Sequence, residues 1–211
     1  MFNDRHDAGK KLALKLERYR GKGAVVLALP RGGVVVGYEI ARVLALPLDI
    51  IAVRKIGHPA SPEYAIGAID EHGATILNNV ETLEIEGRWL AEETERQREE
   101  AKRRSALYRG ERDPVNITGK TAIIVDDGIA TGLTMRLAVR STKTQRPEKI
   151  VIAVPVAPPE SIRALHEEGA DEVIVLESPE EFLGAVGAHY ITFDQVEDNE
   201  VVRLMKSASG S

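Results

Sequence analysis

Two adjacent aspartates, Asp126 and Asp127, follow a short apolar run and precede a turn rich in glycine and threonine. The apolar run, residues 122–125, has the composition of a buried parallel strand, which would deliver both carboxylates to its carboxyl end. Residues 128–134 read Gly-Ile-Ala-Thr-Gly-Leu-Thr, and a helix is expected to follow. Backbone N–H groups in such a turn and at a helix N-terminus can hold a phosphate, and the threonine hydroxyls can add donors. Because carboxylates accept hydrogen bonds from vicinal hydroxyls, the segment suits a sugar phosphate.

A second glycine-rich turn, residues 30–33, reads Pro-Arg-Gly-Gly and lies between an apolar run and an expected helix. The two glycines allow the backbone to approach a ligand closely. Arg31 offers a fork of donors that suits phosphate oxygens. On its own, such a turn is as often a tight corner as a binding site, but beside the acidic motif it indicates a second anion site at a strand end.

Residues 121–134 closely resemble the phosphoribosyl-pyrophosphate (PRPP) signature of the type I phosphoribosyltransferases. In that signature four apolar residues, two acids and three variable residues precede Thr-Gly-x-Thr or Thr-Gly-x-Ser. The resemblance implies that Asp126 and Asp127 bind the ribose 2′ and 3′ hydroxyls, and that residues 130–134 wrap the 5′-phosphate. The alternative is a chance strand–turn–helix corner, which is disfavoured because strand, acid pair and Thr-Gly-x-Thr occur in the right order.

Residues 30–33 resemble the pyrophosphate loop of bacterial purine phosphoribosyltransferases. Those loops often carry a cis peptide before the basic residue, so the resemblance implies a cis Pro30–Arg31 bond. Resemblance extends over residues 24–176, and the whole pattern is similar to prokaryotic phosphoribosyltransferases of unassigned substrate. It implies that Arg31, Lys55, Asp126 and Asp127 are catalytic. The PRPP-binding residues that it implies are Pro30, Arg31, Gly32, Gly33, Arg54, Lys55, Asp126, Asp127, Gly128, Ile129, Ala130, Thr131, Gly132, Leu133 and Thr134.

Residues 54–64 follow the second expected strand and contain two cations, a glycine and two prolines. This composition predicts a mobile but restricted loop. A loop that closes over PRPP would protect the activated sugar from water, and family members carry a flexible catalytic loop in this region. By that resemblance Arg54 and Lys55 meet the pyrophosphate. The alternative for Lys55, a solvated surface cation, stays open.

The implied reaction is attack of a nitrogen nucleophile on C1 of PRPP, with release of pyrophosphate. Mg²⁺ would neutralise the leaving group, and Asp126 and Asp127 would contact it indirectly, through ribose hydroxyls or water. In 6-oxopurine enzymes of the family an aspartate usually precedes Thr-Gly, whereas this chain has Ala130. That departure weakens a hypoxanthine or guanine assignment.

The base pocket of the family is covered by a variable hood, and residues 179–206 are the candidate here. They contain three aromatic residues, Phe182, Tyr190 and Phe193, in an otherwise aromatic-poor half of the chain. A planar base favours an aromatic face with a few hydrogen bonds at its edge. Ordinary core packing explains these aromatics at least as well, so both interpretations stay open.

Strand-like and helix-like segments alternate along the chain, which predicts an α/β fold with helices on both faces of a parallel sheet. The resemblance implies the Rossmann-like, mostly parallel five-stranded sheet of the type I phosphoribosyltransferases, with a small hood and a helical and hairpin insertion. We expect one domain over residues 1–211, with a core near residues 21–178 and a lid and helical insertion near residues 55–112. Strands are expected at residues 24–29, 48–53, 121–126, 150–155 and 172–176, and a hairpin at residues 65–70 and 74–78. Helices are expected at residues 4–20, 34–44, 80–108, 133–141 and 160–168, and a disordered tail at residues 207–211.

The 211 residues carry a net charge of −5 and no cysteine. Disulfides and thiolate sites are therefore excluded, and nothing in the bulk charge favours nucleic acid. The charged segment at residues 88–112 interleaves acids with bases, so it predicts a solvated helix rather than a nucleic-acid-binding stripe. No apolar run reaches membrane-spanning length and no signal-peptide core is evident, so a cytoplasmic location is expected.

The leading interpretation is a Mg²⁺-dependent phosphoribosyltransferase of nucleotide salvage that acts on PRPP and a small nitrogenous base, and the resemblance implies a homodimer. The alternative is a PRPP-sensing regulator on the same fold. A regulator of that kind would be expected to carry a basic face or an added DNA-binding module, and the acid-rich composition and the absence of an evident helix-turn-helix favour the enzyme. PRPP synthesis is a third interpretation, and no Gly-x-x-x-x-Gly-Lys-Ser/Thr loop supports it.

Overall fold

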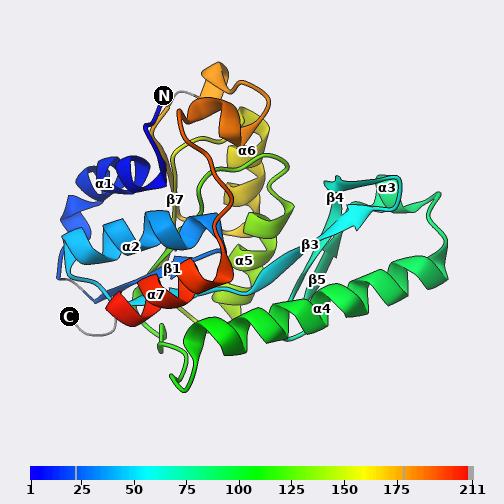
Figure 1. Ribbon diagram of the computed structural model, residues 1–211, viewed down its shortest axis with the longest axis horizontal. Coiled ribbons are helices and arrows are strands. Elements are labelled where there is room, and N and C mark those ends of the chain that lie inside the picture. Colours follow the sequence, from blue (N-terminus) through cyan, green and yellow to red (C-terminus); the bar gives the residue numbers. More distant parts are fainter. Residues whose placement is uncertain (22, 178, 209–211) are drawn as a thin grey trace.

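A central five-stranded parallel sheet organises the chain (Figure 1). The computed structural model describes residues 1–21, 23–177 and 179–208. The strand order is β2-β1-β6-β7-β8, and every neighbouring pair runs parallel. This confirms the predicted α/β class and the mostly parallel sheet. The strands are β1 (Ala24–Ala28), β2 (Leu48–Ile50), β6 (Thr121–Val125), β7 (Lys149–Val154) and β8 (Glu172–Val175).

Helices cover both faces of this sheet. On one face lie α1 (Arg5–Lys15), α2 (Gly32–Leu44) and α7 (Asp198–Ala208), and on the other lie α5 (Leu133–Thr144) and α6 (Pro159–Glu168) (Figure 1). Side chains of a strand point alternately to the two faces. Val26 accordingly packs in the core beneath α2, whereas Val25 packs beneath α5. Apart from Thr121 and Lys149, which begin β6 and β7, the residues of the three central strands are apolar, as expected for strands buried on both faces.

A second, antiparallel sheet and a long helix form an arm that projects from the central sheet (Figure 1). The predicted hairpin is confirmed, since β4 and β5 pair antiparallel. Ile56, Ile66 and Ile69 form a small core, and Trp89 and Leu90 of the long helix pack against it. Leu107, farther along the same helix, is 40% exposed. The elements of the arm are β3 (Val53–His58), β4 (Ser61–Asp70), β5 (Thr75–Leu77), α3 (Asn79–Thr82) and α4 (Gly87–Arg109).

The prediction of a mobile loop at residues 54–64 was wrong. Residues 53–58 and 61–70 pair as antiparallel strands, with a register shift on each side of Gly57. A Cβ on Gly57 would lie 2.3 Å from the Pro62 carbonyl oxygen. Gly57 and the two prolines therefore belong to an irregular hairpin rather than to an open loop. Gly57 lets the two strands approach closely, and the prolines lie at or next to the turn between them.

Other boundaries also differ from the expected ones. The expected strand at residues 48–53 divides, because β2 ends at Ile50 and Val53 begins β3 in the other sheet. The expected helix at residues 80–108 is interrupted between α3 and α4, and the opening helix ends at Lys15, before a short 3-10 turn at Glu17–Tyr19.

The C-terminal part consists of two short 3-10 turns, Pro179–Glu181 and Val186–His189, followed by α7. The prediction of a disordered tail was wrong for Ser207 and Ala208, which form part of the last turn of α7. Residues 209–211 of that tail lie outside the described residues. Among the helices described, none is both long and apolar enough to cross a membrane.

Candidate functional site

The two sequence motifs lie side by side at the carboxyl edge of the sheet. Strands β1 and β6 are neighbours, and each is followed by one of the motifs. From β1 the chain enters α2 on one face of the sheet, and from β6 it enters α5 on the other. The crossovers diverge at this point, which is where open α/β sheets form a ligand-binding crevice.

Close backbone approach joins the two loops. A Cβ on Gly32 would lie 1.9 Å from Oδ2 of Asp127, and a Cβ on Gly33 would lie 2.9 Å from the Val125 carbonyl oxygen. Both positions therefore require glycine for this packing. The Pro30–Arg31 peptide is cis, as the resemblance implied.

The acidic pair is held by hydrogen bonds that shape its charge. Asp127 Oδ2 accepts from Nε of Arg5 at 2.6 Å, and Asp126 Oδ1 accepts from the Asp127 backbone N–H at 2.8 Å. Burial, and then the neighbouring Asp127 charge, raise the pKa of Asp126 well above its ordinary value. Asp126 therefore tends to keep its proton, and a cation bound nearby would favour its ionised form.

The loop after the acidic pair presents unpaired backbone donors. Gly128 and Gly132 have positive φ angles of 155° and 77°. The backbone N–H groups from Ala130 to Met135 make no hydrogen bond to any other described residue. They lie at the N-terminus of α5, so the loop has the donors and the dipole for a phosphate. Ser161 at the start of α6 supports the loop, with its Oγ 3.5 Å from the Ala130 carbonyl oxygen.

The predicted cations take two different places. Arg31 Nη1 lies 3.6 Å from Asp198 Oδ1 and 3.8 Å from Glu197 Oε2. Arg54 lies on β3, and its Nε donates to Gln97 Oε1 of α4 at 3.2 Å. Lys55 lines, together with Arg54, a cavity of about 400 Å³ between β3 and α4. A role for Lys55 at the loops stays a prediction.

The C-terminal aromatics contact the acidic loop or one another. The hydroxyl of Tyr190 donates to the Asp127 carbonyl oxygen at 2.6 Å, and burial raises the pKa of this hydroxyl. Phe182 stacks on His189 with centroids 5.5 Å apart. Phe193 is 36% exposed, and the Arg5 guanidinium lies 3.8 Å from its centroid. Tyr190 therefore positions the acidic loop, while a base-binding role for the three aromatics stays a prediction.

Sequence reasoning missed Arg5, which precedes its partner Asp127 by 122 residues. One local cue exists, because a cation in the first turn of α1 opposes the helix dipole. Such a residue indicates an acidic partner elsewhere. Tyr190 was noted as an aromatic, but no pattern indicated its hydroxyl contact, and Ser161 carries no signal of its own.

Comparison with known proteins identifies the family to which this site belongs. Residues 3–182 match the phosphoribosyl transferase domain. Two proteins from Mycobacterium tuberculosis strains, with provisional phosphoribosyl transferase names, are 43% identical over 210 residues. The match covers 99% of this chain but 47% of theirs, so the chain spans about half the length of these curated relatives.

Two further relatives are of known name or structure. The crystal structure of TT1426 from Thermus thermophilus is similar at 40% sequence identity with a TM-score of 0.79, over 98% of both chains. A uracil phosphoribosyltransferase of Renibacterium salmoninarum is 38% identical over 80 residues, which cover 37% of this chain and 38% of that protein.

Proposed function

The chain belongs to the phosphoribosyl transferase domain family, and from this premise we propose that it transfers 5-phosphoribose from PRPP to a nitrogen of a nucleobase-like acceptor. The observation that carries the proposal is the contact of Gly32 with Asp127, which joins the two anion-binding loops. A ligand with a phosphate at one end, hydroxyls in the middle and a diphosphate at the other end suits this arrangement. PRPP has that chemistry.

In the proposed reaction the loops bind and orient the sugar. Asp126 and Asp127 accept hydrogen bonds from the ribose hydroxyls, and residues 130–134 hold the 5′-phosphate. Arg31, with Arg54 and Lys55, stabilises the charge that develops on the leaving pyrophosphate. The transition state resembles an oxocarbenium ion, so orientation and fixed charges supply most of the rate enhancement. No protein nucleophile is needed.

The acidic pair also fits a role beside Mg²⁺. Carboxylate oxygens are ligands that Mg²⁺ prefers, and Asp126 and Asp127 lie at the sheet edge next to the phosphate loop. Within the described residues, no group of three or more acids or histidines is arranged to hold a metal ion alone. We therefore propose that Asp126 and Asp127 would contact a bound Mg²⁺ indirectly, through ribose hydroxyls or water, and that the ion would neutralise charge on the leaving group.

The acceptor is proposed at the level of its class. Ala130 leaves the position before Thr-Gly without a carboxylate, which argues against a 6-oxopurine. The segment near residues 182–193 contacts the acidic loop through Tyr190, and its aromatics are the proposed base contacts. A single domain and a cytoplasmic location remain predictions from the sequence, and a homodimer and a part in nucleotide salvage remain predictions from the family resemblance.

The test is release of pyrophosphate from Mg-PRPP across a panel of purine, pyrimidine and pyridine bases, with Asp126→Asn/Asp127→Asn protein as the blank. Release with one base well above the blank supports the transferase and identifies its acceptor. If no base supports pyrophosphate release in protein that still binds PRPP, the result would favour a PRPP sensor over a transferase.

A further inference from the structure

Three arginines from three separate elements approach one another beside the turn at residues 30–33. Arg31 precedes α2, Arg54 lies on β3 and Arg104 lies on α4. The residues Gln97, Arg104 and Tyr108 are spaced i, i+7 and i+11, so they share one face of α4. One end of this face contacts Arg54, and the other end contacts Asp198, which lies beside Arg31.

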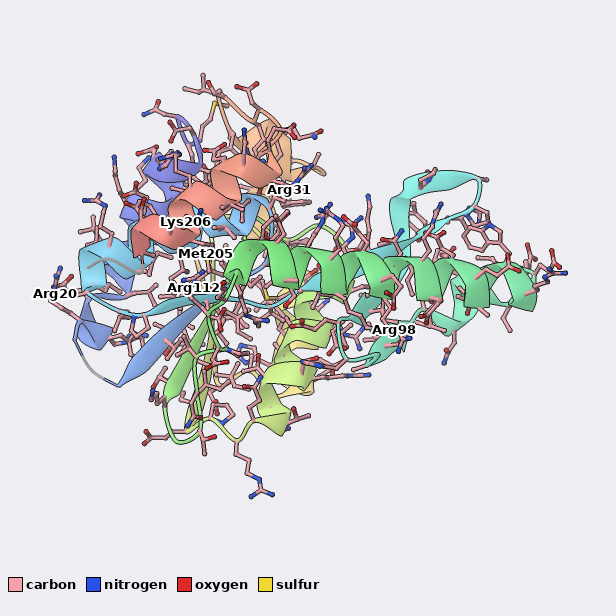
Figure 2. The ribbon with its side chains drawn as sticks, turned by 60° about the horizontal axis from the view of Figure 1, so that its bottom comes forward. Arg20, Arg31, Arg98, Arg112, Met205 and Lys206 are labelled. Atoms are coloured by element: carbon pink, nitrogen blue, oxygen red, sulfur yellow. The ribbon has the colours of Figure 1, made fainter. Side chains whose placement is uncertain are left out.

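At one end of that face, Arg54 Nε donates to Gln97 at 3.2 Å. At the other end, the Tyr108 hydroxyl donates to Asp198 Oδ1 at 2.5 Å, and the same oxygen lies 3.6 Å from Arg31 Nη1. Arg104 therefore lies between Arg54 and Arg31. Figure 2 shows Arg31 close to the start of α7 and the end of α4.

The positive charge of this cluster is only partly balanced. The Arg104 side chain is 13% exposed and pairs with Glu100 at 2.7 Å. No ion pair of Arg54 is seen among the residues that the structure describes. Burial lowers the pKa of Arg54, and the Arg104 and Arg31 charges lower it further, against the effect of Glu100. Like charges held together in this way favour an anionic ligand.

One internal anion already touches the cluster. Asp198 accepts from Tyr108, accepts from Arg103 Nη2 at 3.1 Å, and lies near Arg31. Although burial opposes its ionisation, the hydrogen bonds from Tyr108 and Arg103 hold the pKa of Asp198 below its ordinary value. Its carboxylate also lies in the first turn of α7, where the helix dipole favours negative charge.

We propose that Arg104 of α4 completes the diphosphate site to which Arg31 and Arg54 are assigned above, and that Asp198 of α7, through its contact with Arg31, is an internal anion that competes for this site in the unliganded protein. The inference rests on the proposed function, since it assigns the diphosphate of PRPP, or free pyrophosphate, to a site that includes α4 and α7. A diphosphate offers more charge and more acceptor oxygens than one carboxylate, so it displaces Asp198 from Arg31. The N-terminus of α7 thus competes with substrate and product for the same guanidinium groups.

The experiment is calorimetric titration of Mg-pyrophosphate, and separately of Mg-PRPP, into the whole chain and its variants. Arg104→Ala is expected to weaken pyrophosphate binding about tenfold or more, the effect of losing one charge-assisted hydrogen bond. Arg104→Lys, which keeps the charge, should retain part of that affinity. Asp198→Asn keeps a group that can accept from Tyr108 but removes the competing charge, so it should bind pyrophosphate several-fold more tightly.

Arg98→Ala is the matched control. Arg98 is also an arginine of α4 that pairs with a glutamate, Glu95, but it lies beside Gly73 of the β4–β5 turn, on the other side of α4 from Arg31 (Figure 2). It should leave the pyrophosphate affinity unchanged. Thermal unfolding of each variant confirms that the protein titrated is folded.

Equal pyrophosphate affinities of Arg104→Ala and Arg98→Ala, or no gain with Asp198→Asn, would overturn the diphosphate site. A different result would contradict the proposed function: Asp126→Asn/Asp127→Asn protein would bind PRPP as tightly as the wild type. Dependence of pyrophosphate binding on Arg104 and Asp198 would still support the inference in that case, because free pyrophosphate needs no ribose contact.

Discussion

Asp127 is fixed at both its carboxylate and its carbonyl by residues that lie far from it in the sequence. Arg5 of α1 holds Oδ2, and Tyr190 of the C-terminal segment holds the carbonyl oxygen. Arg5 also donates to the Asp194 carbonyl oxygen at 2.7 Å. The two ends of the fold therefore meet on the acidic loop, which restricts the orientation of Asp127 before any ligand binds.

The raised pKa of Asp126 predicts proton release when Mg-PRPP binds. Burial and the Asp127 charge raise the pKa of Asp126, so this carboxyl keeps its proton above the unfolded pKa. Its contribution to stability is complete below the unfolded pKa and is lost as pH rises through the folded pKa. A ligand that brings a cation favours the ionised form, so affinity should rise with pH across that window.

Calorimetry in two buffers of different ionisation enthalpy, at the same pH, measures the release. The apparent binding enthalpy should differ between the buffers for the wild type and should differ less for Asp126→Asn. Equal enthalpies in both buffers for the wild type would contradict the assigned protonation.

Arg5→Ala should weaken Mg-PRPP binding about tenfold, because one charge-assisted hydrogen bond to Asp127 is lost. The Arg5 charge also lowers the pKa of Asp126, so its removal should shift the pH midpoint of binding upward. Arg5→Lys should keep the midpoint while it loses part of the affinity. Lys10→Ala, which removes an exposed cation from the same helix, serves as the control; an equal effect of both alanine variants would assign Arg5 a general charge effect only.

At the scale of the elements, the two loops depend on how closely β1–α2 and β6–α5 approach. Gly32→Ala would place a methyl group 1.9 Å from Asp127 Oδ2 and 2.8 Å from Arg5 Nε, so the Asp127 carboxylate and its ion pair with Arg5, or the loop itself, must move. Overpacking of this kind costs about 1–3 kcal/mol of stability. We expect kcat/KM to fall about 100-fold, the scale of a displacement of about 1 Å at a reacting group.

Gly87→Ala is the matched control, because a Cβ on Gly87, the first residue of α4, would meet no atom within 4 Å. Steady-state kinetics and thermal unfolding of both variants check the prediction. Gly32→Ala protein with the kinetics of Gly87→Ala would show that the loops do not act as one site.

The sequence predicted those elements whose residues carry their own signal. The apolar runs of β1, β6 and β7 indicated buried strands, and the helix expected at residues 160–168 is present as α6, which ends before Gly169, a residue with a left-handed φ of 110°. The hairpin of β3 and β4 was missed because Gly57 and Pro62 indicate a loop when considered singly. The pairing of these two strands buries Ile56 and Ile66 beneath Trp89 and Leu90 of α4, and no local pattern predicts that contact. The ion pair of Arg5 likewise depends on the fold and not on a local pattern.

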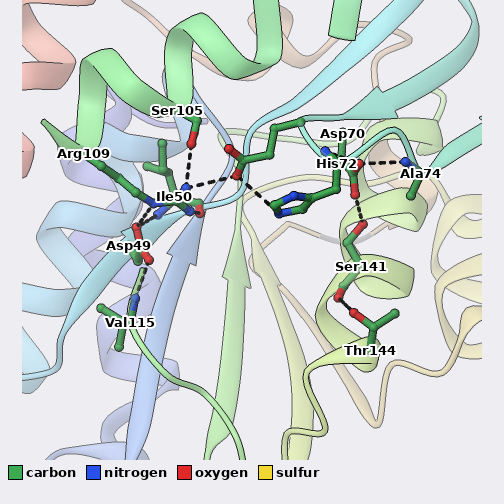
Figure 3. A network of polar contacts seen from close by, with 11 residues as sticks. Asp49, Ile50, Asp70, His72, Ala74, Ser105, Arg109, Val115, Ser141 and Thr144 are labelled. Carbon is green, nitrogen blue, oxygen red and sulfur yellow. Dashed lines mark hydrogen bonds and ion pairs between the residues drawn. The ribbon is translucent and has the colours of Figure 1, made fainter. Parts of the chain in front are cut away.

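At the scale of the whole molecule, Arg109 joins the arm to the central sheet (Figure 3). Its Nε donates to Asp49 Oδ1 of β2 at 2.9 Å, and its Nη1 donates to Glu71 Oε1 of the β4–β5 turn at 3.0 Å. Nη2 donates to the Ile50 carbonyl oxygen at 2.7 Å. The charges of Asp49 and Glu71 hold the pKa of Arg109 above its ordinary value, against the effect of burial.

Arg109→Ala should lower the free energy of unfolding by about 3–5 kcal/mol, because two poorly exposed carboxylates lose their cation. Arg98→Ala, which breaks a more exposed pair on the same helix, should change it by less than about 1 kcal/mol. Urea denaturation of both variants measures the difference. A similar loss in both would show that Arg109 does not fasten the arm.

A calorimetric titration of Mg-PRPP into the wild type and into Asp126→Asn/Asp127→Asn protein is the sharpest test of a PRPP site at the two loops. The two loops are proposed as one PRPP site, and the substitutions remove the charges at its centre while they keep the size of the side chains. We predict binding to the wild type, an affinity about 100-fold lower in the double variant, and an unfolding temperature that is not reduced. Equal affinities in the two proteins, or no binding to the wild type, would show that the two loops do not form a PRPP site.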